Sequence, residues 1–129
     1  MAEIIFRNIC AARGRKDIFA ASAGAAVERG MPVIDDTYVA LESCGECVGE
    51  RKTSATQFTV DMMNEFDHVI CMTRFIKRFL GEHEKVKTLD EFTGCGDIPD
   101  PFGYPLDVYI EVCKKLQQSL KMLYNKICE

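Results

Sequence analysis

Apolar positions that recur three and four residues apart predict several helices along the chain. In the first segment, 1–14, Ile5, Phe6 and Ile9 form such a stripe, and Gly14 supplies a typical helix end. No Ser, Thr, Asp or Asn precedes the first turn, so this helix is expected to start without a side-chain cap of its own.

The same spacing predicts four more helices. The first is capped by Asp35 or Asp36 and ends at Gly45, and its apolar side carries Val39, Ala40 and Cys44. The second is a short helix over 60–66 capped by Thr59, and the third ends at Gly81 and has the stripe Phe75, Ile76, Phe79 and Leu80. The fourth is a C-terminal helix, whose apolar side carries Tyr109, Val112, Leu116, Leu120, Leu123 and Ile127.

Short apolar runs between these helices predict strands at 17–22, 68–72 and 85–89. Because the strands alternate with helices, we expect an α/β domain with a parallel sheet. No repeat, low-complexity stretch or linker interrupts residues 1–129, which indicates a single domain.

Composition narrows the function classes. The net charge of −4 argues against nonspecific nucleic-acid binding, which needs a basic face. No apolar run is long enough for a membrane span, and no signal peptide is visible. The seven cysteines, an odd number scattered through predicted helices and strands, indicate reduced thiols and a cytoplasmic location.

Candidate chemistry lies in loops that follow strands, because sites in open parallel sheets lie at the carboxyl ends of the strands. Asp100 stands between two prolines in "DIPDPFGYPLD", residues 97–107, and a carboxylate on so restrained a backbone suits a general acid or base. The alternative is a turn Asp that caps its own backbone, and the residues alone favour this alternative.

The remaining titratable groups give weaker signals. Cys44 and Cys47 have the C-x-x-C spacing of redox and zinc sites, but the pair ends a predicted helix, where the dipole disfavours a thiolate. No second close ligand pair accompanies them, so two incidental thiols are favoured over a metal or redox site. Cys71 is expected in the core, and the isolated His68 and His83 are expected to be structural or surface residues.

Five stretches together carry a resemblance to a known family. They are "MAEIIFR" (1–7), "SAG" (22–24), "TVDMMNEFDHVICMT" (59–73), "KVKTLDEF" (85–92) and "DPFGYPLDVY" (100–109). In order and spacing they resemble low-molecular-weight protein tyrosine phosphatases over essentially the whole chain. The "MT" and "DPFG" segments are similar to the bacterial branch that includes protein-arginine phosphatases.

The resemblance implies a flavodoxin-like parallel sheet with helices on both faces. In the family, a first strand and a phosphate-binding loop, C-x5-R-S, precede the helix that begins this chain. None of the seven cysteines is followed by that pattern. We therefore expect an N-terminally truncated domain that lacks the central first strand and the nucleophile, and that is inactive alone.

The resemblance also implies roles for three residues. Asp100 would be the general acid that protonates the leaving group and then activates water against a phosphocysteine. Phe102 would wall the substrate pocket, and Ser22 would support the missing loop. "TSAT", Thr53 to Thr56, stands where tyrosine-directed members have "HxAR". No metal or other cofactor is needed, and the partner would be a phosphorylated protein carrying phosphotyrosine or phosphoarginine.

Two other interpretations stay open. One is a catalytically dead remnant that acts as a binding or oligomeric module, since a missing central strand would leave apolar edges that favour self-association. The other is a thiol-redox protein similar to arsenate reductases, with Cys44, Cys47 and Cys71 as candidate resolving thiols.

Overall fold

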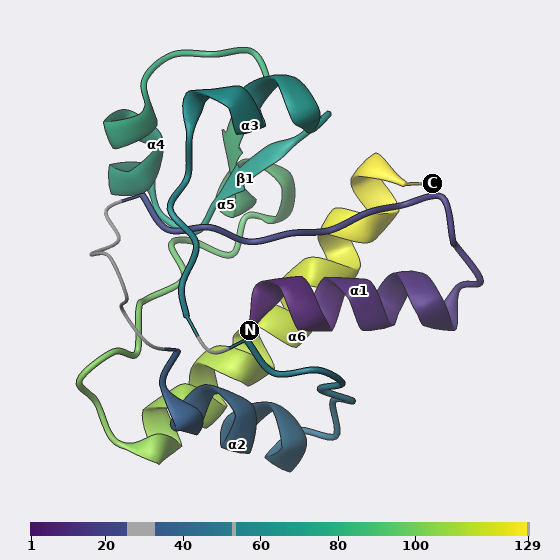
Figure 1. Cartoon of the computed structure of the whole chain (residues 1–129), viewed down its shortest axis with the longest axis vertical. Coiled ribbons are helices and arrows are strands. Elements are labelled where there is room, and N and C mark those ends of the chain that lie inside the picture. Colours follow the sequence, from purple (N-terminus) through teal and green to yellow (C-terminus); the bar gives the residue numbers. More distant parts are fainter. Residues whose placement is uncertain (26–32, 53, 129) are drawn as a thin grey trace.

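The computed structural model describes residues 1–25, 33–52 and 54–128. Figure 1 shows its elements: α1 (Ala2–Ala12), α2 (Asp35–Ser43), α3 (Val60–Glu65), β1 (Val69–Cys71), α4 (Arg74–Leu80), β2 (Val86–Thr88), α5 (Leu89–Thr93) and α6 (Leu106–Ile127). Helices and a parallel strand pair alternate, which confirms the predicted α/β class.

The sheet pairs β1 with β2 in parallel, with Val69 opposite Val86 and Cys71 opposite Thr88. Both strands lie inside the runs predicted at 68–72 and 85–89. In β2 the side chains of Val86 and Thr88 are buried while Lys87 between them is exposed, as the two-residue period of a strand requires.

The strand predicted at 17–22 is wrong. Phe19 is 79% exposed, and Ile18 and Ala20 are only partly buried. Within the described residues, the first sheet-like pairing comes later, where Gly24 forms a parallel bridge with Gln57. A run with strand propensity forms a strand only beside a partner backbone, because its N–H and C=O groups must be paired between chains.

The two N-terminal helices fit the predicted ranges, and one of them differs in detail. Met1 precedes α1 without a side-chain cap, as expected. In α2 the N-cap is Ile34, and Asp35 and Asp36 occupy the first turn, where the helix dipole favours their charge. Val39 was expected on the apolar side but is 40% exposed.

Tyr38, Ala40 and Leu41 form the buried side of α2, which confirms the prediction for Ala40 but not for Val39.

The short helices around the sheet depart from the pattern in other ways. Thr59 takes the N-cap position of α3 but makes no side-chain cap bond. α4 ends at Gly81, as predicted, yet Phe75 and Phe79 of its apolar stripe are 70% and 59% exposed. α5 was not predicted; a reciprocal capping box at its start, with Thr88 as the N-cap, defines this single turn.

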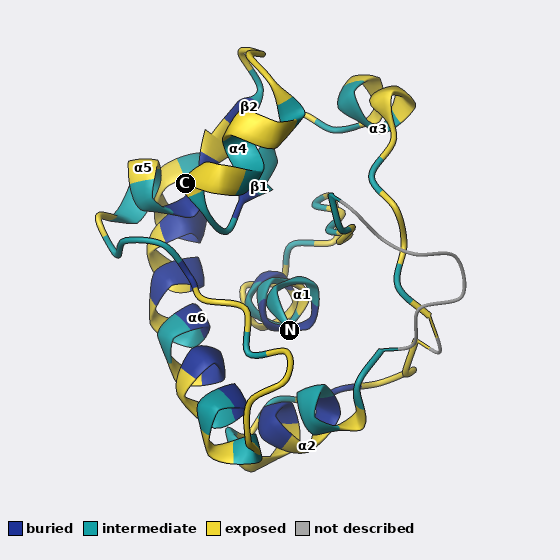
Figure 2. Cartoon of the chain, turned by 90° about the vertical axis from the view of Figure 1, so that its left-hand side faces the viewer, coloured by how far each residue is buried: buried dark blue, intermediate teal, exposed yellow. Residues whose placement is uncertain are grey.

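The hydrophobic core forms around α6, whose buried stripe faces the other helices (Figure 2). α1, α2 and α5 all pack against it. Its buried residues are Tyr109, Val112, Cys113, Leu116, Ser119, Leu120, Leu123 and Tyr124, which confirms the predicted stripe except at the partly buried Ile127.

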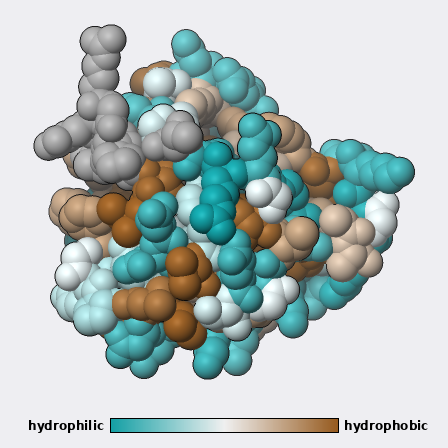
Figure 3. Space-filling view, turned by 60° about the horizontal axis from the view of Figure 1, so that its bottom comes forward, coloured by the Kyte–Doolittle hydropathy of each residue, from teal (hydrophilic) through white to brown (hydrophobic). Residues whose placement is uncertain are grey.

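The surface mixes apolar and hydrophilic side chains. On the face seen in Figure 3, brown apolar groups lie scattered among teal hydrophilic ones. None of the helices in the described part of the chain combines the length and apolar character that a membrane span requires.

Candidate functional site

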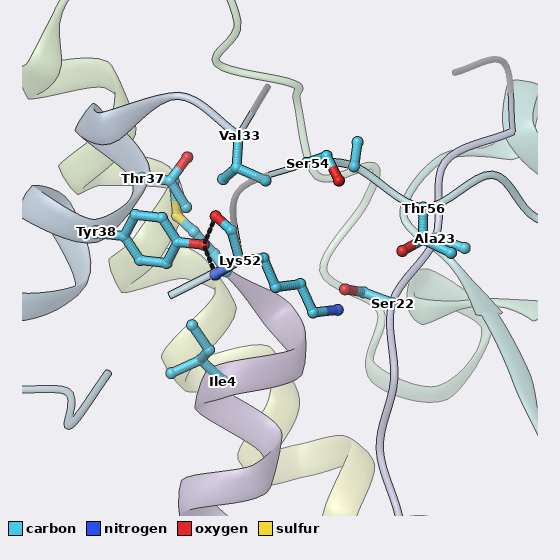
Figure 4. Close-up of a pocket in the computed structure, with 11 residues that line it drawn as sticks. Ile4, Ser22, Ala23, Val33, Thr37, Tyr38, Lys52, Ser54 and Thr56 are labelled. Atoms are coloured by element: carbon cyan, nitrogen blue, oxygen red, sulfur yellow. Dashed lines mark hydrogen bonds between the residues drawn. The ribbon is translucent and has the colours of Figure 1, made fainter. Parts of the chain in front are cut away.

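A cavity of about 200 Å³ opens where α1 begins, between two loops and the first turn of α2 (Figure 4). Its described lining consists of Met1, Ile4, Ser22, Ala23, Val33, Thr37, Tyr38, Lys52, Ser54, Ala55 and Thr56. Several of these side chains carry hydroxyl groups, and one carries an ammonium. The N–H groups of the first turn of a helix are left without intrahelical partners, so this end of α1 carries a partial positive charge.

Glu3, in the first turn of α1, forms hydrogen bonds with two of the residues that line the cavity. Its Oε1 accepts hydrogen bonds from Lys52 Nζ at 2.7 Å and from Ser22 Oγ at 3.0 Å, and its Oε2 lies 3.7 Å from Arg7. The Glu3 side chain is 10% exposed. Burial alone would raise the pKa of Glu3, but the bonds from Lys52 and Ser22 outweigh it and hold the pKa below its ordinary value.

Tyr38 fixes the backbone of the loop that carries Lys52. Its buried hydroxyl donates to the Lys52 carbonyl at 3.0 Å and accepts from the Lys52 N–H at 2.8 Å (Figure 4). Because the phenol bonds to both the N–H and the C=O of Lys52, it fixes the position of the loop beside α2. Figure 4 shows the Lys52 side chain extending from this anchor toward Ser22.

Asp100 lies on a separate loop, between α5 and α6. Its Oδ1 accepts the N–H of Phe102 at 3.0 Å, the Asx-turn geometry of the alternative that the residues alone favour. The preceding stretch is anchored by the Ile98 N–H, which donates to the Met72 carbonyl at 2.9 Å. Asp100 itself is exposed, and no hydrogen bond to its second carboxylate oxygen is found among the described residues.

Two aromatic side chains project beside Asp100. Phe102 is 62% exposed and Tyr104 is 61% exposed. Tyr109 is buried in α6, and burial followed by the charges of Asp100 and Asp36 raises its pKa. Tyr104 was not singled out from the sequence, although its place two residues after Phe102 in a restrained loop is a usable signal.

The structure separates the predicted site residues into two groups. Ser22 lines the cavity at α1, whereas Asp100 and Phe102 are absent from the described lining. Glu3 and Lys52 were missed, because their link joins residues far apart in sequence and no local motif marks it. Of the "TSAT" stretch, Ser54, Ala55 and Thr56 line the cavity, and Thr53 lies outside the described residues.

The cysteines and histidines lie elsewhere. Cys71 is buried in β1, where burial raises its pKa, and Cys47 is exposed. His68 and His83 are both exposed, and His83 Nδ1 accepts the N–H of Lys85 at 3.1 Å. The part of the chain that the structure describes contains no group of three or more His, Cys, Asp or Glu residues placed to hold a metal ion.

Comparison with known proteins gives one consistent result. A protein-arginine-phosphatase of Bacillus subtilis (strain 168) is 26% identical over 140 residues, which cover 98% of this chain and 87% of the relative. The crystal structure of a low molecular weight protein tyrosine phosphatase from T. tengcongensis is similar with a TM-score of 0.85 and 30% identity, covering 98% of this chain and 88% of that one.

A third relative is informative about chemistry. It is a cysteine-to-serine mutant of the YwlE arginine phosphatase with a phosphorylated active-site serine, similar with a TM-score of 0.87 and 27% identity over 99% of this chain and 86% of that one. These solved structures share a flavodoxin-like fold, which agrees with the predicted fold class. The family described as low molecular weight phosphotyrosine protein phosphatase matches residues 1–129, and the chain therefore belongs to this phosphatase family.

Proposed function

We propose that this chain forms the body of a cysteine-based protein phosphatase that hydrolyses phosphorylated side chains through a phosphocysteine intermediate. The observation that carries the proposal is the family match over the whole of 1–129, which includes the loop that holds Asp100. The relative with a phosphorylated serine in place of its active-site cysteine supports an intermediate on that side chain.

We propose that the nucleophile comes from a segment other than 1–129. None of the seven cysteines is followed by the family's C-x5-R-S pattern. The cavity at the start of α1 is the place where such a loop would pack, because its N–H groups and the helix end would together cradle a phosphate. The same positive field would keep the loop cysteine as a thiolate, and the loop arginine would bind two phosphate oxygens.

Asp100 is proposed as the general acid and base. Its exposed carboxylate oxygen would first protonate the leaving group and then take a proton from the water that attacks the phosphocysteine. The bond from the Phe102 N–H to the other oxygen fixes the direction of the carboxylate, so the turn geometry and the catalytic role are compatible.

Phe102 and Tyr104 are proposed as walls of the substrate pocket. Both rings are largely exposed and lie on the Asp100 loop, where they would contact the side chain that carries the phosphate. Phosphoarginine and phosphotyrosine both present a flat group that packs on such rings. The arginine phosphatases among the relatives favour phosphoarginine as the first substrate to assay.

A chain extended at its N-terminus tests this function. The first strand and C-x5-R-S loop of the Bacillus subtilis protein-arginine-phosphatase would be joined before Met1 and the product assayed on phosphoarginine and phosphotyrosine proteins. We expect turnover that disappears when the grafted cysteine becomes serine. Asp100→Asn should lower kcat by about 10²–10⁴-fold, while the matched change Asp107→Asn in the same segment should not.

The unextended chain gives the opposing outcome. Residues 1–129 alone should show no turnover, and Asp100→Asn should change nothing. If residues 1–129 alone hydrolyse the phosphorylated proteins and Asp100→Asn abolishes this activity, no added nucleophile is needed and the proposal is wrong. The intact mass of the native protein separates the alternatives further. A mass above 14.5 kDa by a strand and a loop supports the enzyme, and a mass of 14.5 kDa supports a binding module without activity.

A further inference from the structure

Two cysteines from distant parts of the chain meet where α2 ends against α6. Cys44 is the residue that follows α2, and its thiol donates a hydrogen bond to the Ile110 carbonyl at 3.9 Å. The Cys44 carbonyl accepts from Gln117 Nε2 at 3.0 Å. Cys113 lies three residues after Ile110 and four before Gln117, so all three share one face of α6. Cys44 therefore lies against the part of α6 that carries Cys113, and it packs against the core cluster to which Cys113 belongs.

The two thiols differ in access to solvent. Cys113 is fully buried, whereas Cys44 is partly exposed. Burial, and then the hydrogen bond and charge of Cys44, raise the pKa of Cys113 to about 12. The Glu46 carboxylate acts in the same direction. Cys113 is thus a neutral thiol that is shielded from solvent behind a more accessible one.

We propose that Cys44 and Cys113 form an oxidation-sensitive dithiol, which a peroxide converts to a disulfide that ties the end of α2 to the middle of α6. In the first step the Cys44 sulfur attacks one oxygen of hydrogen peroxide. The O–O bond breaks, and the released hydroxide takes the thiol proton and leaves as water. Cys44 is now a sulfenic acid, oxidised by two electrons.

In the second step the Cys113 sulfur attacks the Cys44 sulfur. The S–S bond forms as the S–O bond breaks, and the departing hydroxide takes the Cys113 proton to give a second water. Two thiols and one peroxide thus yield one disulfide and two waters. Because Cys113 stays protonated over most of the pH range, this step is slow and speeds up toward alkaline pH.

The geometry favours this pair over the C-x-x-C pair. Cys47 is exposed, and its carbonyl accepts a hydrogen bond from Asn8 Nδ2 at 2.9 Å on the α1 side. The Cys44 thiol points the other way, toward Ile110 on α6. The C-x-x-C spacing raised Cys44 and Cys47 as a possible pair, whereas the fold turns the Cys44 thiol toward α6.

The cross-link would restrain α2, which forms part of the cavity wall. Thr37 and Tyr38 of α2 line it, and Tyr38 holds the backbone of Lys52. A bond from Cys44 to α6 fixes α2 and closes a long loop, which removes conformational freedom from the unfolded chain. The oxidised chain should therefore melt at a higher temperature than the reduced chain.

Peptide mapping of the full chain tests the proposal. Reduced protein would be treated with hydrogen peroxide at rising concentration, remaining thiols blocked, and the digest analysed by mass spectrometry. We expect the peptide with Cys44 joined to the peptide with Cys113, together with the rise in Tm. The matched variant Cys47→Ser should keep both effects, and Cys44→Ser should lose both.

Three results would overturn the proposal: a link between Cys44 and Cys47, a Cys44 sulfinate beside a free Cys113, or complete recovery of both thiols at millimolar peroxide. The mapping uses wild-type protein, so it does not depend on a variant that folds poorly. Its readout is a mass, so a failed phosphatase assay leaves it unaffected.

Discussion

The carboxylate of Glu3 accepts a hydrogen bond from the Lys52 ammonium at 2.7 Å, across 49 residues of sequence. The bond joins the first turn of α1 to the loop that carries Lys52, which lines the cavity. Ser22 reaches the same carboxylate oxygen from a third segment. One side chain therefore links three parts of the chain beside the candidate site.

Lys52→Met should lower the free energy of unfolding, because it leaves a mostly buried carboxylate with fewer partners. Lys52 is itself 44% exposed, and Ser22 remains bonded to Glu3, so we expect a loss of about 1 kcal/mol. Urea denaturation measures it. Lys121→Met, at an exposed position of α6, is the matched control. Equal effects of the two variants would mean that the contact contributes nothing specific.

The lowered pKa of Glu3 predicts a loss of stability in acid. A group whose pKa is depressed in the fold stabilises it above the ordinary value and loses that contribution as the pH falls through the folded value. The loss should therefore begin near pH 4.5 and continue below it. In Glu3→Gln the unfolding free energy should fall less steeply over this range. Parallel pH profiles for the two proteins would contradict the assignment to Glu3.

The sequence predicts the elements that depend on local periodicity and fails where a distant partner decides. The stripe of α6 is long enough to define a helix by itself, and Asp100 is marked by the turn chemistry around it. Residues 17–22 have the composition of a strand, yet Phe19 is exposed because pairing depends on a neighbouring backbone. Composition shows that a residue can enter a sheet or a core, but not whether its partner is present.

The candidate site divides in the same way. Asp100 was singled out because the prolines on either side restrict its backbone locally, and Phe102 followed only from the family resemblance. The link between Glu3 and Lys52 was not predicted, because an exposed-looking Glu in a first helical turn is ordinary for a helix. Its partner is determined by how α1 and the loop pack, which leaves no mark at either position.

The capping box at the start of α5 predicts that removing the Thr88 hydroxyl lowers the stability of the fold. Thr88 Oγ1 accepts the Glu91 N–H at 3.1 Å, and Glu91 Oε2 accepts the Thr88 N–H. Thr88→Ala should therefore lower the unfolding free energy by about 1 kcal/mol, measured by urea denaturation. Thr88→Ser keeps the hydroxyl and should lose less. If serine costs as much as alanine, the buried methyl group matters and the cap does not.

The exposed aromatic surface near the sheet predicts self-association. Phe19 stacks on Phe66 with ring centroids 6.1 Å apart, and Phe19 remains 79% exposed. Sedimentation velocity should show association of 1–129 that grows with concentration, since this apolar surface would be buried against a second copy. Phe19→Ser should weaken it, whereas Met122→Ser, at a 45% exposed position on α6, should not. A monomer at every concentration would contradict the prediction.

The raised pKa of Cys113 predicts a loss of stability in alkali. Below the ordinary thiol value of 9.0 the group is neutral in both states. As the pH rises above that value the unfolded chain ionises this thiol, whereas the folded chain holds it neutral until about pH 12. Stability should therefore fall between these values, by about 1.4 kcal/mol per pH unit for one such group.

Cys113→Ala should be less stable at neutral pH because it leaves a small cavity, yet its stability should fall less steeply in alkali. Unfolding in urea under reducing conditions, from pH 7 to the alkaline limit, compares the two slopes. Equal slopes would show that Cys113 ionises in the fold as readily as in the unfolded chain, which its burial against Cys44 argues against.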